Sequence, residues 1–352
     1  MKFRNARLVA APVPVALSVV LWGCPAWGVI VYGTQGSNDL TTTPVPETID
    51  GTSIGDYEGT FGGFVGTPIS PRFLVTATHI GTGYTSFSYA NGTATTTAYP
   101  VQYVASDGDL AIYEIAPTSA ATFSLYAPLY TGGSEVGQPL VVLGQGTTRG
   151  SEIAGHGWNW GGGTNAITWG TNTVAAVLTA GQGGFETPSS NFSGDFLQFT
   201  FDNLGSPDTS TSNEAIISSG DSGGGVFVLD PTTGQYELDG VNSLVDTVED
   251  ASGNPVDAAL YDDNGYYTTD SMGNLVQITD NDPLSSYATR IEPRVAFIDA
   301  VTGVPEPAGA AMVLVVAPMV MGRRRRRKVP GGRIFTTETR RHGEERPRRD
   351  GI

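Results

Sequence analysis

Short runs of β-branched and aromatic residues, separated by glycine-rich turns, restrict the fold of residues 29–304 more than any other feature of the sequence. Clear examples are 73–76, 111–115, 140–143 and 226–229. Turn formers such as Asp107-Gly108 stand between them. This spacing predicts an all-β protein built from sandwiches or barrels. Residues 293–301 are the exception, because their apolar positions have the period of a short helix.

The composition of residues 29–304 excludes several classes of function. This body has four arginines, no lysine and 30 acidic residues, so its surface repels phosphate groups and nucleic-acid binding is excluded. The one cysteine of the chain, Cys24, lies before it. The body therefore has no intramolecular disulfide, no cysteine-ligated zinc and no cysteine nucleophile, and we expect no cofactor.

The first 28 residues predict a secretory signal. Three basic residues precede an apolar run, and the small residues Ala26 and Gly28 predict cleavage after Gly28. An uncleaved membrane anchor is the first alternative, disfavoured because the apolar run is short. Lipidation of Cys24 is the second, disfavoured by the bulky Trp22 two positions earlier.

Residues 304–328 have a second sorting pattern. Val304-Pro305-Glu306-Pro307 precedes a short apolar stretch and then five arginines and Lys328. An arginine cluster of this kind stays on the cytoplasmic side of the membrane. The order resembles the PEP-CTERM sorting signal of Gram-negative bacteria that produce exopolysaccharide, which an exosortase processes. We therefore expect export to the cell surface or extracellular matrix, with signal peptidase and an exosortase-type enzyme as partners. The chain would touch the membrane only through 304–328, and residues 329–352 read as a polar, disordered tail.

Three short segments carry residues capable of chemistry. They are the strand-like run that ends in Thr78-His79, the acid Asp109 before Leu110-Ala111-Ile112, and Ser222 within Gly220-Asp221-Ser222-Gly223-Gly224-Gly225. Taken alone, His79 is more typical of a structural histidine and Asp109 of a solvated carboxylate in a turn. The segment around Ser222 is, alone, more typical of a glycine-rich hairpin. Glycines around a serine nevertheless let the backbone turn sharply and let a substrate approach the amides.

In the order histidine, aspartate, serine, these segments resemble the chymotrypsin-like serine proteases. The resemblance spans roughly residues 60–302 and matches His79 to the histidine of T-A-x-H, Asp109 to the acid of D-L-A, and Ser222 to the nucleophile of G-D-S-G-G. It implies two Greek-key six-stranded β-barrels and a short C-terminal helix. The first half, 29–145, would carry the histidine and aspartate, and the second, 146–303, the serine.

The resemblance also implies a role for each residue. Ser222 attacks the peptide carbonyl, His79 takes its proton and later returns it, and Asp109 orients the imidazole. Asp107 is the competing acid. The backbone N–H groups of Gly220 and Ser222 stabilise the oxyanion.

Substrate contacts are implied in the same way. Ile216 matches the base of the primary pocket, and Ser243 lies on the strand that binds an extended substrate, with Leu244 and Val245 after it. An apolar residue at 216 argues against cleavage after arginine or lysine. We expect small or medium apolar side chains before the scissile bond.

Activation is a further expectation drawn from the family. Cleavage after Gly28 would expose the amine of Val29, and Asp221 matches the acid that pairs with such an amine. The alternative is that activation needs no such pair.

Two other groups are interpreted as structural. His156 lies in a glycine-rich loop beside two tryptophans and is expected to be structural or to line the rim of the site. Five acids have no EF-hand spacing, so solvated turns are favoured over a Ca²⁺ site and no metal is expected. These acids are Asp262, Asp263, Asp270, Asp280 and Asp282.

The leading hypothesis is an exported, surface-sorted serine endopeptidase acting on proteins or peptides. One alternative is a catalytically inactive adhesin or matrix protein with the protease fold, disfavoured by the intact His79, Asp109 and Ser222. The other is a β-rich coat protein in which the three motifs are coincidental, and it requires no proximity between His79 and Ser222.

Overall fold

A computed structural model of the protein describes residues 28–33, 38–39, 45–48, 51–163, 166–179, 195–203, 213–270 and 272–303. All of them belong to the first of two units of the chain, Met1–Glu306. The predicted signal before Gly28, the sorting segment and the tail lie outside the described residues. Within the described ranges, no helix has the length and apolar character needed to cross a membrane.

The predicted all-β architecture is confirmed, and its first half is a closed six-stranded barrel. The strands follow the order β3 (Gly59–Thr60), β4 (Val65–Pro68), β5 (Phe73–Ala77), β8 (Leu110–Ile115), β7 (Thr97–Asp107) and β6 (Ser86–Tyr89). Strand β8 is buried along most of its length and contains one charged residue, Glu114, because both of its faces are covered. Ala111 and Tyr113 face the aromatic interior of the barrel, whereas Leu110 and Ile112 join the cluster shared with the second half.

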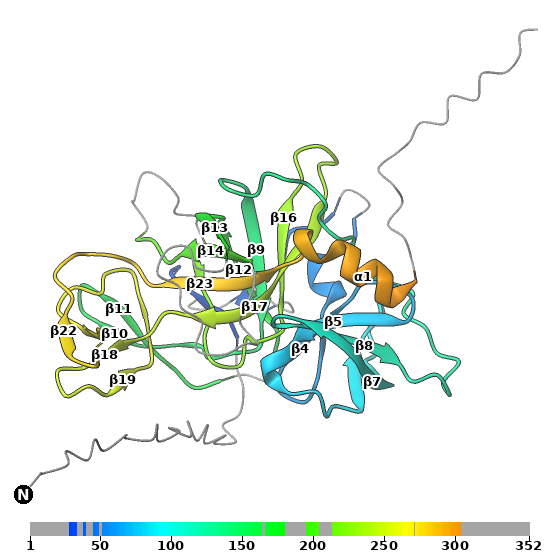
Figure 1. Ribbon diagram of the computed structural model, residues 1–352, viewed down its shortest axis with the longest axis horizontal. Helices are drawn as coiled ribbons and strands as arrows, with labels where there is room; N and C mark the ends of the chain where they lie inside the picture. The colour runs from blue at the N-terminus through cyan, green and yellow to red at the C-terminus, as the bar shows by residue number, and fades with distance from the viewer. Residues whose placement is uncertain are drawn as a thin grey trace, which may run out of the picture. The chain divides into compact units, whose positions relative to one another are not determined.

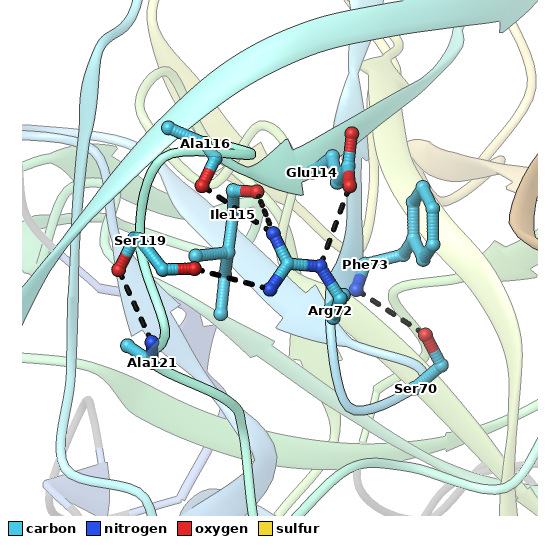
Figure 2. Close-up of polar contacts among 8 residues, drawn as sticks. All are labelled: Ser70, Arg72, Phe73, Glu114, Ile115, Ala116, Ser119 and Ala121. Carbon is cyan, nitrogen blue, oxygen red and sulfur yellow. Dashed lines mark hydrogen bonds and ion pairs between the residues drawn. The ribbon is translucent and has the colours of Figure 1, made fainter.

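The antiparallel pair β5–β8 is fixed at both ends. Near the end that leads to His79, Ala77 pairs with Leu110. At the other end the guanidinium of Arg72 donates to the carbonyls of Ile115, Ala116 and Ser119 and pairs with Glu114 at 3.4 Å (Figure 2). Because a one-residue slip would move every side chain to the opposite face, this register determines which residues emerge together at the far end.

The second half is a curled, open sheet rather than a barrel closed by strand pairing. Its order is β13 (Ala176–Leu178), β14 (Phe196–Thr200), β23 (Ser285–Arg290), β17 (Tyr236–Val245), β16 (Gly225–Leu229), β9 (Pro139–Gly144), β12 (Thr168–Thr173) and β2 (Asn38–Asp39). Across the opening, the buried Asn172 donates from Nδ2 to the carbonyl of Thr200 at 2.7 Å and to that of Ala215 at 3.0 Å. A side-chain amide thus joins β12 to β14 where no ladder does.

The predicted boundary at residue 145 does not coincide with the change of sheet. Strand β9 lies before the boundary but pairs with β12 and β16 of the second half. Strand β1 (Ile30–Val31) also pairs with a second-half strand, β15 (Ala215–Ile216). The chain therefore begins in the second half, builds the barrel, and returns before β9.

Residues 246–284 add strands between β17 and β23, on the left in Figure 1. They are β18 (Val248–Glu249), β19 (Pro255–Val256), β20 (Ala258–Leu260), β21 (Tyr267–Thr269) and β22 (Leu275–Gln277). Strand β20 extends the pair β10 (Arg149–Ile153) and β11 (Gly157–Trp160), and the other four form their own sheet. The helical elements are η1 (Ile54–Tyr57), η2 (Thr78–Ile80), η4 (Glu292–Arg294) and the C-terminal α1 (Val295–Thr302), which confirms the predicted helix.

Glu58 is a buried carboxyl at the contact between the two halves. Its Oε1 accepts hydrogen bonds from Thr67 Oγ1 of the barrel at 2.9 Å and from the backbone N–H of Gly225, in the second half, at 3.2 Å. Its Oε2 is buried and makes no hydrogen bond to any described residue. Burial raises the pKa of Glu58 to about 8, against a usual value of 4.5, so the neutral acid is the form that fits.

The raised pKa of Glu58 predicts that stability falls as the pH rises. The unfolded chain loses this proton near pH 4.5 and the folded chain near pH 8, so folding weakens between these values by about 1 kcal/mol per pH unit. Glu58→Gln should reduce the slope measured by urea unfolding at pH 5.5, 6.5 and 7.5 by about this amount, and the other buried carboxyls keep the rest. Glu152→Gln, at an exposed position, is the control and should keep the whole slope. An unchanged slope in Glu58→Gln would contradict this account.

Candidate active site

Two neighbouring strands bring His79 and Asp109 together. Strand β5 ends at Ala77, and the single turn η2 then presents His79. Asp109 is the second residue of the two-residue turn between β7 and β8, and Gly108 supplies the positive φ of +59° that the turn needs. The N–H of Thr78 donates to the carbonyl of Asp109 at 2.7 Å, which continues the β5–β8 ladder into the site.

The carboxyl of Asp109 is buried and accepts from three donors. Its Oδ1 accepts the backbone N–H of His79 at 2.9 Å. Its Oδ2 lies 2.7 Å from Nδ1 of His79 and accepts the Ser243 hydroxyl at 2.5 Å. In this arrangement Nδ1 of His79 carries a proton and donates it to Asp109. Nε2, the other ring nitrogen, is left as an acceptor.

The hydroxyl of Ser222 lies 2.7 Å from Nε2 of His79. With Nδ1 protonated, Ser222 Oγ–H is the donor in this contact. The structure therefore places a serine hydroxyl, an imidazole and a carboxyl in one hydrogen-bonded line. The coincidence hypothesis, in which the three motifs lie apart, does not fit these distances.

Ser222 lies in a tight loop before β16, and both halves hold this loop. The N–H of Val65, in the barrel, donates to the carbonyl of Ser222 at 3.3 Å. On the other side the N–H of Gly223 donates to the carbonyl of Asn242 at 3.0 Å. Gly223 has a φ of +84°, and a Cβ there would lie 2.2 Å from Thr76 Oγ1, so only glycine fits.

The N–H groups of Gly220 and Ser222 remain available beside the serine. Neither donates to another residue in the described part of the chain. Buried or half-buried N–H groups are nearly always paired, so these two donors are available to a ligand atom beside the hydroxyl.

No protein-family model matches this sequence, and no curated protein does. The chemical interpretation of the site depends on its geometry and on the sequence motifs that brought these residues to attention.

The competing acid, Asp107, lies away from the imidazole. Its side chain is 52% exposed and its Oδ2 lies 3.8 Å from Nε of Arg294. Asp109, with no exposed side-chain surface, is the acid in contact with His79.

The residues expected to contact substrate are placed unequally. Ser243 lies beside the site, where it binds Asp109. Leu244 and Val245 are half-buried at the end of β17, past a bulge at Ser243. Ile216 is fully buried: it pairs with Ile30 and belongs to an apolar cluster that includes Val248, Ala258, Ala259 and Leu260 from the added segment.

Asp221 is buried without a cation. Its carboxylate accepts the N–H groups of Gly146 and Ser218, both at 2.6 Å, and the Ser218 hydroxyl at 3.0 Å. Burial raises its pKa to about 8. Val29 is fully buried, and its carbonyl accepts a hydrogen bond from Thr168 Oγ1. Thr168 pairs with Gly144, and Gly144 packs against the Asp221 carboxyl, so one strand residue links the surroundings of Val29 to those of Asp221.

Three of the remaining acids singled out from the sequence, Asp262, Asp263 and Asp270, accept backbone N–H groups in turns. His156 Nδ1 lies 3.0 Å from the carbonyl of Asp262, away from Ser222. Asp270 accepts the N–H groups of Met272 and Asn274 within its own turn, and Asp263 accepts that of Asp282. Over the described ranges, no set of three or more histidine, cysteine or acidic residues is arranged to hold a metal ion.

Sequence reasoning missed Asn242, the main support of the serine loop. Its side-chain Nδ2 donates to the carbonyls of Leu143 and Asp221, at 2.7 and 3.1 Å. Its N–H donates to the carbonyl of Gly224. The sequence carried one signal for this role: Asn242 places a polar amide side chain directly after Val241, inside a run that is otherwise typical of a buried strand.

Proposed function

We propose that this protein is an exported serine endopeptidase that cleaves proteins or peptides through an acyl-enzyme. The observation that carries the proposal is the 2.7 Å contact between Ser222 Oγ and Nε2 of an imidazole whose Nδ1 binds Asp109. A serine hydroxyl is a weak nucleophile alone and needs such a base. The motif order in the sequence and the all-β two-part fold support the same function.

The chemistry would proceed in two stages. Ser222 Oγ attacks the peptide carbonyl while Nε2 of His79 takes its proton, and Asp109 stabilises the imidazolium through Nδ1. His79 then protonates the leaving amine, which leaves the acyl group on Ser222. In the second stage water attacks the acyl carbon and gives a proton to His79. His79 then returns this proton to Ser222 Oγ as the bond between Oγ and the acyl carbon breaks, which releases the acid.

The free N–H groups of Gly220 and Ser222 would bind the negative oxygen that forms in both stages. One such donor typically contributes a factor of about 10² to 10³ in rate. Residues 246–284 would influence specificity, since they pack around Ile216, which the motif match assigns to the base of the primary pocket. Export and surface sorting remain part of the proposal, on the evidence of residues 1–28 and 304–328.

Covalent labelling with a fluorophosphonate tests the nucleophile. The wild-type protein should gain one adduct on Ser222, because the probe requires an activated hydroxyl. Ser222→Ala should gain none, and His79→Ala should react at least about 10³-fold more slowly. His156→Ala is the matched control, since this histidine lies away from the site, and it should label like the wild type. Intact mass spectrometry reads all four.

Labelling that persists in Ser222→Ala would show that another residue is the nucleophile. A folded wild type that is never labelled would favour either a precursor that awaits processing or the inactive adhesin or matrix protein.

A peptide library tests the primary specificity. Because Ile216 is apolar and buried, kcat/KM should be at least about tenfold higher for alanine or valine before the scissile bond than for arginine or lysine. A preference for the basic residues would contradict this assignment of the pocket.

Acetylation tests the proposed pair of Val29 and Asp221. Residues 29–304 contain no lysine, so the terminal amine of a chain with these bounds is its one primary amine and can be modified selectively. Blocking its charge should lower peptide hydrolysis at least about tenfold, because Asp221 would keep no counter-charge. Asp221→Asn should lower it similarly. Full activity after acetylation, with the fold intact by circular dichroism, would show that activation needs no such pair.

A further inference from the structure

Arg294 is a buried cation that the proposed chemistry does not use. It ends η4 and immediately precedes α1, and its side chain is 5% exposed. A charge at this depth is costly unless it is paired and hydrogen-bonded. Its partners therefore indicate what it holds in place.

The guanidinium of Arg294 binds the turn that carries Asp109. Its Nε donates to the carbonyl of Asp107 at 3.2 Å and lies 3.8 Å from the Asp107 carboxylate. Its NH1 donates to the carbonyl of Arg290 at 2.7 Å and to that of Asp195 at 3.4 Å. Gly108 alone separates Asp107 from Asp109, so fixing the first residue of this turn constrains the last.

The helix that follows Arg294 holds it against the barrel. Helix α1 packs against β7 (Figure 1), and its Ile298 belongs to the cluster that also contains Leu110, the first residue after Asp109. The N–H of Ile291 donates to the carbonyl of Asp239, which ties the start of η4 to β17. The cation therefore has a fixed position.

The charges around Arg294 come from three elements besides its own. Asp107 at the end of β7, Asp195 before β14, and Asp109 favour its charged form, while Arg290 of β23 opposes it. Burial lowers the pKa of Arg294, but a guanidinium remains charged at any ordinary pH. A permanent positive charge thus lies in the poorly solvated region that contains Asp109, where charges interact more strongly than in water.

We propose that Arg294 is a positioning residue of the site. It fixes the turn 107–109 from the C-terminal helix, and it places a positive charge near the Asp109 carboxyl that binds the His79 imidazole. This inference deepens the proposed function and rests on it for its catalytic meaning. The effect of the Arg294 charge on His79 and Asp109 can be measured in the resting protein, without substrate turnover.

The test is an NMR titration of the histidines in the full chain. The sequence has three, and the His79 signal is identified by its absence from His79→Gln. Arg294→Met should raise the pKa of His79, since it removes a positive charge from the surroundings of the Asp109 carboxyl. Arg294→Lys keeps the charge and should shift it by less than half as much. The acidic limb of kcat/KM against pH should move in the same direction in Arg294→Met.

If Arg294 had only a structural role, Arg294→Met and Arg294→Lys would not differ in their effect on the His79 pKa. An unchanged His79 pKa in Arg294→Met, or an equal shift in Arg294→Lys, would overturn the proposal. If Arg294→Met does not fold, Arg294→Gln serves instead, because it keeps hydrogen-bond donors and removes the charge. The loss of charge should again raise the His79 pKa, and an unchanged value would overturn the proposal.

Peptide hydrolysis by the same wild-type protein separates the two ideas. The expected pKa shifts in a protein that hydrolyses nothing would retain the role of Arg294 and remove the protease. Hydrolysis with no pKa shift would do the reverse.

Discussion

The contact between the six-stranded barrel and the curled sheet is the constraint on which the rest of the site depends. One half supplies His79 and Asp109, and the other supplies Ser222. The serine loop is held from both sides, by Val65 in the barrel and by Asn242 in the sheet. Any change in how the halves pack would therefore separate His79 from Ser222 before it altered either strand system.

The same contact accounts for two deeply buried ionisable groups in a body, residues 29–304, that has only four arginines and no lysine. Glu58 reaches across it as a neutral acid, and Arg294 reaches the acid turn as a cation. Each is an expensive group to bury, and each bonds backbone atoms on a different segment. Hydrogen bonds with fixed directions specify one relative placement of those segments, which apolar packing alone does not.

Sequence patterns predicted the strands, the short helix and the three chemical segments, because each is local: a hydrophobic run, a turn, a glycine-flanked serine. They could not predict contacts that depend on tertiary neighbours. Asn242, Glu58 and Arg294 have no local signature, since their roles come from residues far away in the chain. Strand β9 was assigned to the wrong side of the boundary for the same reason: its partners β12 and β16 both come later in the chain.

Residues 246–284 begin and end on paired strands, β17 and β23, and the N–H of Asp246 donates to the carbonyl of Ser285 where they leave the sheet. The segment is thus a long insertion between two neighbouring strands whose ends are hydrogen-bonded to each other. Its exposed turns can change in length at little cost in loop-closure entropy and without disturbing the β17–β23 ladder, provided that the residues that cover Ile216 are kept. A fold of this kind has a position at which segments of different length can be inserted while the arrangement of His79, Asp109 and Ser222 stays the same.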